Sequence, residues 1–386
     1  MSDSFTETVT TGWLSRIGNS IKGIVVGIIL IIASFPVLFI NEGCAVKTRK
    51  DLNQGAKECV PADSASVDSA NEGKLVHLHG MAKSQAPLND DQFGVSAEAL
   101  KLKRQVEMYQ WKENTSTDTK KKLGGKEEKT TTYTYEKVWA EGRIDSGKFN
   151  QSSDHANPSS TLGSQIWTAT PITTGAYTLS SGLVDQIANF TPLPVQSPQS
   201  EIADIDGRKV QWNNSHYYIG SNPAAPVLGD LKVSYLAAMP TEVSIIARQT
   251  GQSFSPFTGD SGTTINMLQI GTHTAAAMFD SAQESNKIRT WIVRVVGFVV
   301  MFIGFGLIFK PLSVVADVLP IAGDIVGVGT GIVAFLLAAP LSLITISVAW
   351  IFYRPLIGVP LLLLAGVGLY FLFKKIAAVR KAKGKS

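Results

Sequence analysis

The chain has 386 residues, of which 45% are hydrophobic, and its formal net charge is +4. The hydrophobic residues form one block near the N-terminus and a long stretch after about residue 290, and the part between them is polar and holds most of the charge. This segregation excludes a single soluble core and is typical of a membrane protein with a water-soluble insert.

Four segments are apolar enough to cross a bilayer. A spanning helix needs about 20 mostly apolar residues, because each residue adds about 1.5 Å against a hydrocarbon thickness near 30 Å. The segments are residues 23–40, 291–309, 325–350 and 356–373. They predict an α+β membrane protein with one N-terminal and three C-terminal transmembrane helices. A large β-rich α+β extracytoplasmic domain, residues 41–290, is inserted between helices 1 and 2.

Residues 1–22 precede the first predicted span. Trp13, Leu14, Ile17 and Ile21 fall on one helical face, which predicts a short interfacial helix leading into the membrane. A cleaved signal peptide is the alternative, but the apolar run is too long and residues 41–44 make a poor cleavage site. We therefore expect a retained anchor.

The orientation is predicted from the C-terminal tail, residues 374–386. Its basic residues have no acidic neighbour in the tail: Lys374, Lys375, Arg380, Lys381, Lys383 and Lys385. The positive-inside rule places this tail in the cytoplasm, where it can also meet anionic lipid headgroups. Four crossings then place residues 1–22 and the loop 310–324 in the cytoplasm, and residues 41–290 on the other side. Lys47 and Arg294, which flank the insert, favour the opposite orientation, but long translocated domains weaken the rule.

The insert shows the period-two alternation that is typical of strands. Leu100, Leu102, Val106 and Met108 share one face of residues 100–111. Residues 130–142 are the natural partner, joined through the charged tip KKKLGGKEEK, so we predict a long β-hairpin with a solvated end. Further strands are predicted at residues 75–80, 165–170, 209–212, 231–236, 243–249 and 266–270, and a short amphipathic helix at 179–190.

Two residue pairs are candidates for chemistry. His77 and His79 lie two apart in LVHLHG, so a strand would point both imidazoles to one side, as in a half-site for zinc or copper. The sequence supplies no recognisable further ligands, which favours two polar residues on a sheet face. Cys44 and Cys59 could close a small disulfide loop in an oxidising compartment, although two unrelated thiols are favoured. No motif of nucleophilic catalysis is present, and we expect no catalytic residues and no cofactor.

Small residues recur at helical spacing in the predicted spans. Gly323, Gly327 and Gly331 are spaced by four and form one smooth helix face, and Gly23 and Gly27 repeat the pattern on the first span. This is the pattern of close helix packing, within one chain or between chains. A pore lining is the less favoured alternative.

Several ordered segments resemble the transmembrane protein 43, or LUMA, family. They are NEGCAV (41–46), VEMYQW (106–111), LSSGLVDQIANF (179–190), GDLKVSY (229–235), IARQTG (246–251), the TW pair at 290–291, and WIFYRPL (350–356). Cys44 departs from the pattern, because a basic residue is expected there in animal members. The resemblance implies four spans with both termini on the cytoplasmic or nucleoplasmic side. It also implies self-association, organisation of membrane protein complexes, and no established enzyme activity.

The leading functional hypothesis is therefore a non-enzymatic, multi-pass membrane scaffold. We expect a homo-oligomer in contact with the lipid bilayer and other membrane proteins, and no nucleic-acid partner. The resemblance implies the endoplasmic reticulum and inner nuclear membrane in a eukaryote, or the cytoplasmic (inner) membrane in a bacterium. A channel or channel subunit formed by the three C-terminal spans is the alternative, and a metal-dependent enzyme using His77 and His79 is the third.

Overall fold

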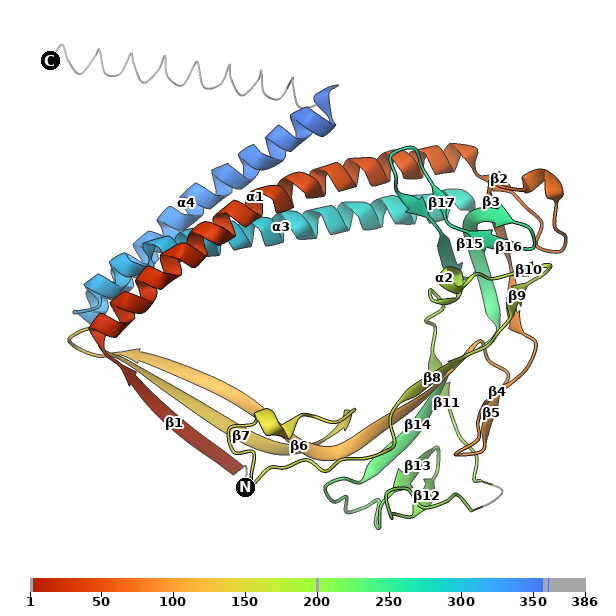
Figure 1. Cartoon of the computed structure of the whole chain (residues 1–386), viewed down its shortest axis with the longest axis horizontal. Coiled ribbons are helices and arrows are strands. Elements are labelled where there is room, and N and C mark those ends of the chain that lie inside the picture. Colours follow the sequence, from red (N-terminus) through yellow and green to blue (C-terminus); the bar gives the residue numbers. More distant parts are fainter. Residues whose placement is uncertain (1–2, 199–200, 357–359, 361–386) are drawn as a thin grey trace.

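The computed structural model describes residues 3–198, 201–356 and 360. The chain forms a ring in which long helices make an arch on one side and long strands run along the other (Figure 1). A β-rich domain joins the two at one end. At the opposite end, the strands turn back close to the beginning of the first helix.

Three long helices, α1 (Trp13–Glu58), α3 (Ala275–Ala316) and α4 (Pro320–Tyr353), form the helical arch. All three are long and apolar enough to cross a membrane, so the described residues hold three candidate spans where four were predicted for the whole chain. The predicted fourth span, 356–373, lies almost wholly outside the described residues. The predicted interfacial helix, the first span and the start of the insert form one helix, α1, about 69 Å long at 1.5 Å per residue.

The arch has an apolar interior. Leu38 of α1, Met301 of α3 and Ala338 of α4 are fully buried against one another, and phenylalanines of α1 and α3 surround them. The centre of this bundle is therefore a packed core and not an open passage.

The larger sheet has eight strands and contains the predicted hairpin. Its main path is β1-β7-β6-β14-β13-β12, with β8 paired to β6 and β11 paired to β14. The strands are β1 (Asp3–Thr11), β6 (Lys101–Lys121), β7 (Glu127–Glu141), β8 (Gln165–Thr168), β11 (Thr191–Leu193), β12 (Val210–Asn213), β13 (His216–Ile219) and β14 (Leu231–Ala238). The hairpin β6–β7 is confirmed, and it is longer than the alternating apolar pattern indicated.

The second sheet has seven strands and lies at the other end of the domain. Its path is β10-β9-β3-β15-β16, with β19 on β15 and β2 parallel to β3. The strands are β2 (Val60–Pro61), β3 (Leu75–Ser84), β9 (Ile172–Thr174), β10 (Tyr177–Thr178), β15 (Thr241–Thr250), β16 (Ser253–Ser255) and β19 (Met267–Ile270). Two small ladders complete the domain: β4 (Leu88–Asp90) with β5 (Val95–Ala97), and β17 (Phe257–Thr258) with β18 (Thr264–Ile265).

Each sheet covers its own apolar core. Val76, Leu78 and Ile245 of the second sheet pack against the segment that contains Leu183 and Ile187. Val106, Val233 and Tyr235 of the first sheet pack against Phe93 and Ile219. A third cluster, including Leu52 of α1 and Phe279 of α3, joins the helices to the second sheet.

Two sequence expectations differ from the fold. The segment 179–190 contains only one helical turn, α2 (Ser181–Val184), because its apolar residues fill the core of the second sheet as an irregular segment. Residues 3–11 form strand β1, which the sequence analysis does not predict. The segment is mostly polar, with Phe5 and Val9 as its large apolar residues. They pair antiparallel with β7 over nine residue pairs, from Asp3 with Tyr135 to Thr11 with Glu127.

Candidate functional site

The tip of the hairpin is fastened to the helical arch by a polar cluster, which we call the distal clasp: Trp13, Arg16, Lys121, Gly125, Glu127 and Asp317. Arg16 of α1 donates to the backbone oxygen of Gly125 at 2.7 Å and pairs with Asp317 at 2.5 Å. Lys121 of β6 lies 2.9 Å from Asp317, which follows α3 and is 1% exposed. The clasp therefore joins three separate parts of the chain.

Local geometry explains why the hairpin turns at this point. Gly125 has a φ of +74°, and a β-carbon there would collide with the indole of Trp13, so glycine is required on both counts. The Trp13 indole donates to the backbone oxygen of Val314 at 2.8 Å. The backbone N–H of Gly124 donates to the oxygen of Val318 at 3.0 Å. The tip is thus held by the backbone at the α3–α4 connection as well as by charge.

A second polar cluster lies at the other end of the arch. Glu42 of α1 is completely buried and accepts two hydrogen bonds from Arg294 of α3, at 2.6 and 2.9 Å. The indole of Trp350 on α4 donates to the same carboxylate at 2.7 Å. Because a buried carboxylate needs such partners, this cluster fixes the relative positions of the three helices.

Asp51 fastens the far end of α1 to the domain. It is fully buried, and its carboxylate accepts hydrogen bonds from the backbone N–H groups of Ser261 (2.8 Å) and Thr263 (2.7 Å). Burial alone would raise the pKa of Asp51, but these hydrogen bonds outweigh it and lower the pKa. Asp51 is therefore held as an anion between α1 and the β17–β18 loop.

The glycines that were predicted to pack helices together differ in how closely other atoms surround them. A β-carbon on Gly27 would lie 2.5 Å from the backbone oxygen of Gly304, so α1 and α3 approach closely there, whereas Gly23 has only ordinary contacts with Leu307. On α4, Gly323 lies against Asp317, and Gly327 lies near the Ser313 hydroxyl. Gly331, by contrast, has no atom within 4 Å of its β-carbon position.

His77 and His79 lie on β3 with their ring centroids 6.4 Å apart. The Nε2 atom of His77 is 2.9 Å from the backbone oxygen of His273, and burial lowers the pKa of His77. Within the described residues, no group of three or more His, Cys, Asp or Glu side chains is gathered as a metal site. His77 is therefore hydrogen-bonded within the domain, and among the described residues neither histidine belongs to a ligand set.

Cys44 and Cys59 are both free thiols. They lie on α1 and at its C-terminal cap, so the helix separates them by roughly 22 Å, far beyond the roughly 7 Å limit for a disulfide. A disulfide between Cys44 and Cys59, the less favoured alternative of the sequence analysis, therefore does not fit this geometry. Burial raises the pKa of Cys59 to about 11. The basic tail residues 374–386 lie outside the described residues.

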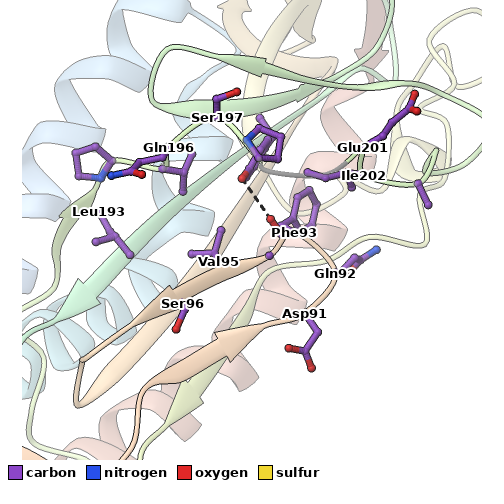
Figure 2. A pocket seen from close by; sticks show the side chains of 16 residues that line it. Asp91, Gln92, Phe93, Val95, Ser96, Leu193, Gln196, Ser197, Glu201 and Ile202 are labelled. Carbon is purple, nitrogen blue, oxygen red and sulfur yellow. Dashed lines mark hydrogen bonds between the residues drawn. The ribbon is translucent and has the colours of Figure 1, made fainter.

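A cavity of about 930 Å³ opens beside the β4–β5 turn (Figure 2). Phe93 and Val95 come from that turn, and Leu193 and Ile202 come from the segment that faces it. Tyr217 closes the inner side by donating to the backbone oxygen of Phe93 at 3.3 Å. The labelled carboxylates, Asp91 and Glu201, point outward at the rim, so the cavity presents an apolar floor with a polar border.

The outer surface of the arch is strongly apolar. Large side chains on all three helices are exposed, among them Ile29 and Ile32 of α1, Val295 of α3, and Ile325 and Leu336 of α4. Exposed apolar surface of this extent marks contact with lipid or with other apolar helices. The structure is thus that of a membrane protein.

Comparison with known proteins identifies the family. The family model for transmembrane protein 43 matches residues 108–355. This chain belongs to the transmembrane protein 43 family. Human transmembrane protein 43 is 36% identical over 370 residues, covering 93% of this chain and 90% of the human protein. The rat protein is 35% identical, with 89% and 88% covered. The transmembrane protein 43 homolog of Drosophila melanogaster is 28% identical, with 90% and 93% covered. No solved structure shows significant similarity to the chain.

The comparison confirms the family resemblance of the sequence, but sequence reasoning missed the residues that hold the arch. The sequence analysis does not single out Arg16, Glu42 or Asp317. One signal was present: Glu42 and Arg294 lie at the same end of two apolar segments, with opposite charges. Asp51 carried no comparable signal, because its partners are backbone groups of a loop.

Proposed function

We propose that this protein is a non-enzymatic membrane scaffold that self-associates through its helical arch and recruits other membrane proteins through its β-rich domain. The observation that carries the proposal is the exposed apolar surface of the arch, joined by buried polar clusters to a large folded domain. A scaffold needs a rigid connection between its membrane part and its partner-binding part, and Asp51 and Glu42 supply it.

Family membership supports the location that we propose. Relatives in rat, human and fly carry the same family name over nearly the whole chain. We propose the endoplasmic reticulum and inner nuclear membrane if the source is eukaryotic, and the cytoplasmic (inner) membrane if it is bacterial. The apolar core around Leu38 and Met301 gives no support to a channel within one chain.

Self-association is tested by cross-linking in intact membranes, with a substitution at Gly331. Gly331 is a small residue on α4 with open space around it, so a second helix can approach closely there. Gly331→Leu should reduce the cross-linked oligomer several-fold and leave the monomer folded. Gly306→Leu on α3 is the matched control, because it also has no atom within 4 Å and lies outside the predicted α4 face. A protein that remains monomeric at every cross-linker concentration would contradict the proposal.

A further inference from the structure

We propose that a groove between α1 and α3 binds the headgroup of an anionic phospholipid, whose phosphate is held by Arg289. The groove contains a cavity of about 220 Å³, lined by residues between 37 and 48 of α1 and between 286 and 293 of α3. Pockets for whole drug-sized ligands usually enclose about 300–1,000 Å³, so this cavity fits a headgroup whose acyl chains remain outside. The proposal does not depend on self-association.

The lining of the groove changes from apolar to polar along the helix axes. Val37 and Ile40 of α1 and Val293 of α3 line the end that faces the apolar segments. Thr48 and Arg289 line the end nearer the β-rich domain. From Val37 to Thr48 the helix rises about 16 Å, which covers a headgroup region of about 5–8 Å and the adjoining hydrocarbon. A phospholipid at the membrane surface has the same order of apolar and polar parts.

Two asparagine side chains hold the walls of the groove together. The amide of Asn41 donates to the backbone oxygen of Thr290 at 3.2 Å, and the amide of Asn286 donates to the backbone oxygen of Ala45 at 3.0 Å. One bond runs from each helix to the other, and the two lie about one helical turn apart. The groove is therefore formed before a ligand arrives, which lowers the entropic cost of binding.

The charges of α3 leave one arginine available for an anion. Lys287 is paired with Glu284 at 3.2 Å, and Arg294 is paired with the buried Glu42 at 2.6 Å. Arg289 is exposed at the groove and forms no such pair among the described residues. A guanidinium binds phosphate through two parallel hydrogen bonds, so a phosphate at this position supplies the missing counter-charge.

The basic residues of α1 favour an anionic headgroup over a zwitterionic one. Lys47, Arg49 and Lys50 follow the apolar segment and are exposed. The next acidic residue, Asp51, is buried and already accepts hydrogen bonds from the loop that contains Ser261, so it does not neutralise them. Lysines and arginines at a membrane surface attract anionic lipids, whereas the ammonium group of a zwitterionic headgroup meets repulsion here.

The thiol of Cys44 measures whether the groove is filled, because Cys44 lines the cavity and is exposed. A full-length chain that carries Cys59→Ser keeps Cys44 as its single thiol. The protein is reconstituted into bilayers of phosphatidylcholine alone, or of phosphatidylcholine and phosphatidylglycerol in equal amounts. Alkylation by N-ethylmaleimide, an uncharged reagent, is then followed over time. We expect it to be several-fold slower in the mixed bilayer, and equal rates would overturn the proposal.

A cysteine outside the groove controls for general effects of the anionic surface. Ile288→Cys is placed in a chain with Cys44→Ser and Cys59→Ser. Ile288 is 53% exposed and lies about 200° of helix rotation from both Asn286 and Thr290, on the opposite face of α3. Its alkylation should differ little between the two bilayers. Equal slowing at Ile288→Cys and at Cys44 would show that the bilayer and not the groove protects the thiol.

Arg289→Gln tests the phosphate contact itself and should abolish the protection of Cys44. Lys287→Gln is the matched control, because it removes the same charge from an exposed residue that already pairs with Glu284, and it should keep the protection. Protection that survives Arg289→Gln, or that is lost in both variants, would contradict the assignment. Inorganic phosphate added to the protein in phosphatidylcholine alone should not protect Cys44, and full protection by phosphate would make the groove a site for a free anion.

Discussion

At the scale of single residues, the chain holds its parts together with buried charges that have backbone partners. Asp51 shows the principle: it brings a carboxylate from α1 to two N–H groups of a loop more than 200 residues later. Hydrogen bonds to a charged group are stronger than neutral ones, and leaving their partners unsatisfied costs more than the bond contributes. Such residues are expected to dominate the response to substitution.

Replacing Asp51 with Asn tests this at a single site. At neutral pH we expect the domain to lose about 1–3 kcal/mol of stability, because the anionic acceptor of two N–H groups is removed. The pKa of Asp51 is lowered, so its contribution is complete above the unfolded value near 3.9 and is lost as the pH falls through the still lower folded value. The difference in melting temperature between the two proteins should therefore shrink below about pH 4.

The matched control is Asp260→Asn, which changes an exposed carboxylate in the same loop. It should shift the melting temperature little at any pH. An equal loss in both variants would show that the loop tolerates no change of charge and that the buried hydrogen bonds are not the cause.

At the scale of elements, the helices pack by small residues and the hairpin is closed by charge. Gly27 and Gly304 let α1 and α3 approach until backbone meets backbone. The clasp at the hairpin tip is built differently: its buried Asp317 needs Arg16 and Lys121 to remain in place. Substitutions at the glycine contact and in the distal clasp should therefore have different effects.

Gly27→Leu should separate α1 from α3. A β-carbon at this position meets the Gly304 oxygen at 2.5 Å, and backbone atoms cannot give way as a flexible side chain can. We expect a loss of about 1–3 kcal/mol, seen as a lower melting temperature of the purified protein in detergent. Gly306→Leu should leave the melting temperature nearly unchanged, since nothing lies within 4 Å; equal losses would refute this view of the packing.

Arg16→Ala should open the distal clasp. It leaves Asp317 buried with only Lys121 beside it, and removing one partner of a buried ion pair typically costs about 3–5 kcal/mol. Amide hydrogen exchange should become faster in residues 118–129 and in β1, and remain unchanged in β14 and β15. Lys112→Ala removes an exposed pair with Glu136 and should change exchange little. An unaltered tip in Arg16→Ala would mean that the charge pair does not hold the hairpin.

The sequence predicted the elements better than their long-range contacts. Apolar length revealed the three described helices, and period-two alternation revealed β3, β6, β14 and β15, because both signals are local. Strand β1 is exposed on both faces and is held by a partner more than 100 residues away, so no local pattern in the sequence predicts it. The same holds for Arg16 and Asp317, which are adjacent only after the ring has closed.

At the scale of the whole molecule, the chain is a closed ring with an apolar arch and a polar hairpin of similar length. At about 3.3 Å per residue, β6 extends roughly 69 Å, which matches α1 and lets the tip reach the beginning of that helix. The antiparallel pairing of β1 with β7 closes this ring. Whether these two strands are paired in the membrane is therefore the question on which the shape of the molecule depends.

Disulfide trapping between β1 and β7 in intact membranes answers that question most directly. Thr8→Cys and Thr130→Cys are introduced together into a chain that carries Cys44→Ser and Cys59→Ser, and the register places them opposite each other. Thr117→Cys with Thr131→Cys, a register pair within the hairpin, shares a compartment in any topology and serves as the reference. We predict that both pairs form intramolecular disulfides to a similar extent under mild oxidation, whereas a disulfide in the reference pair alone would show that β1 does not pair with β7 and that the ring is open in the membrane.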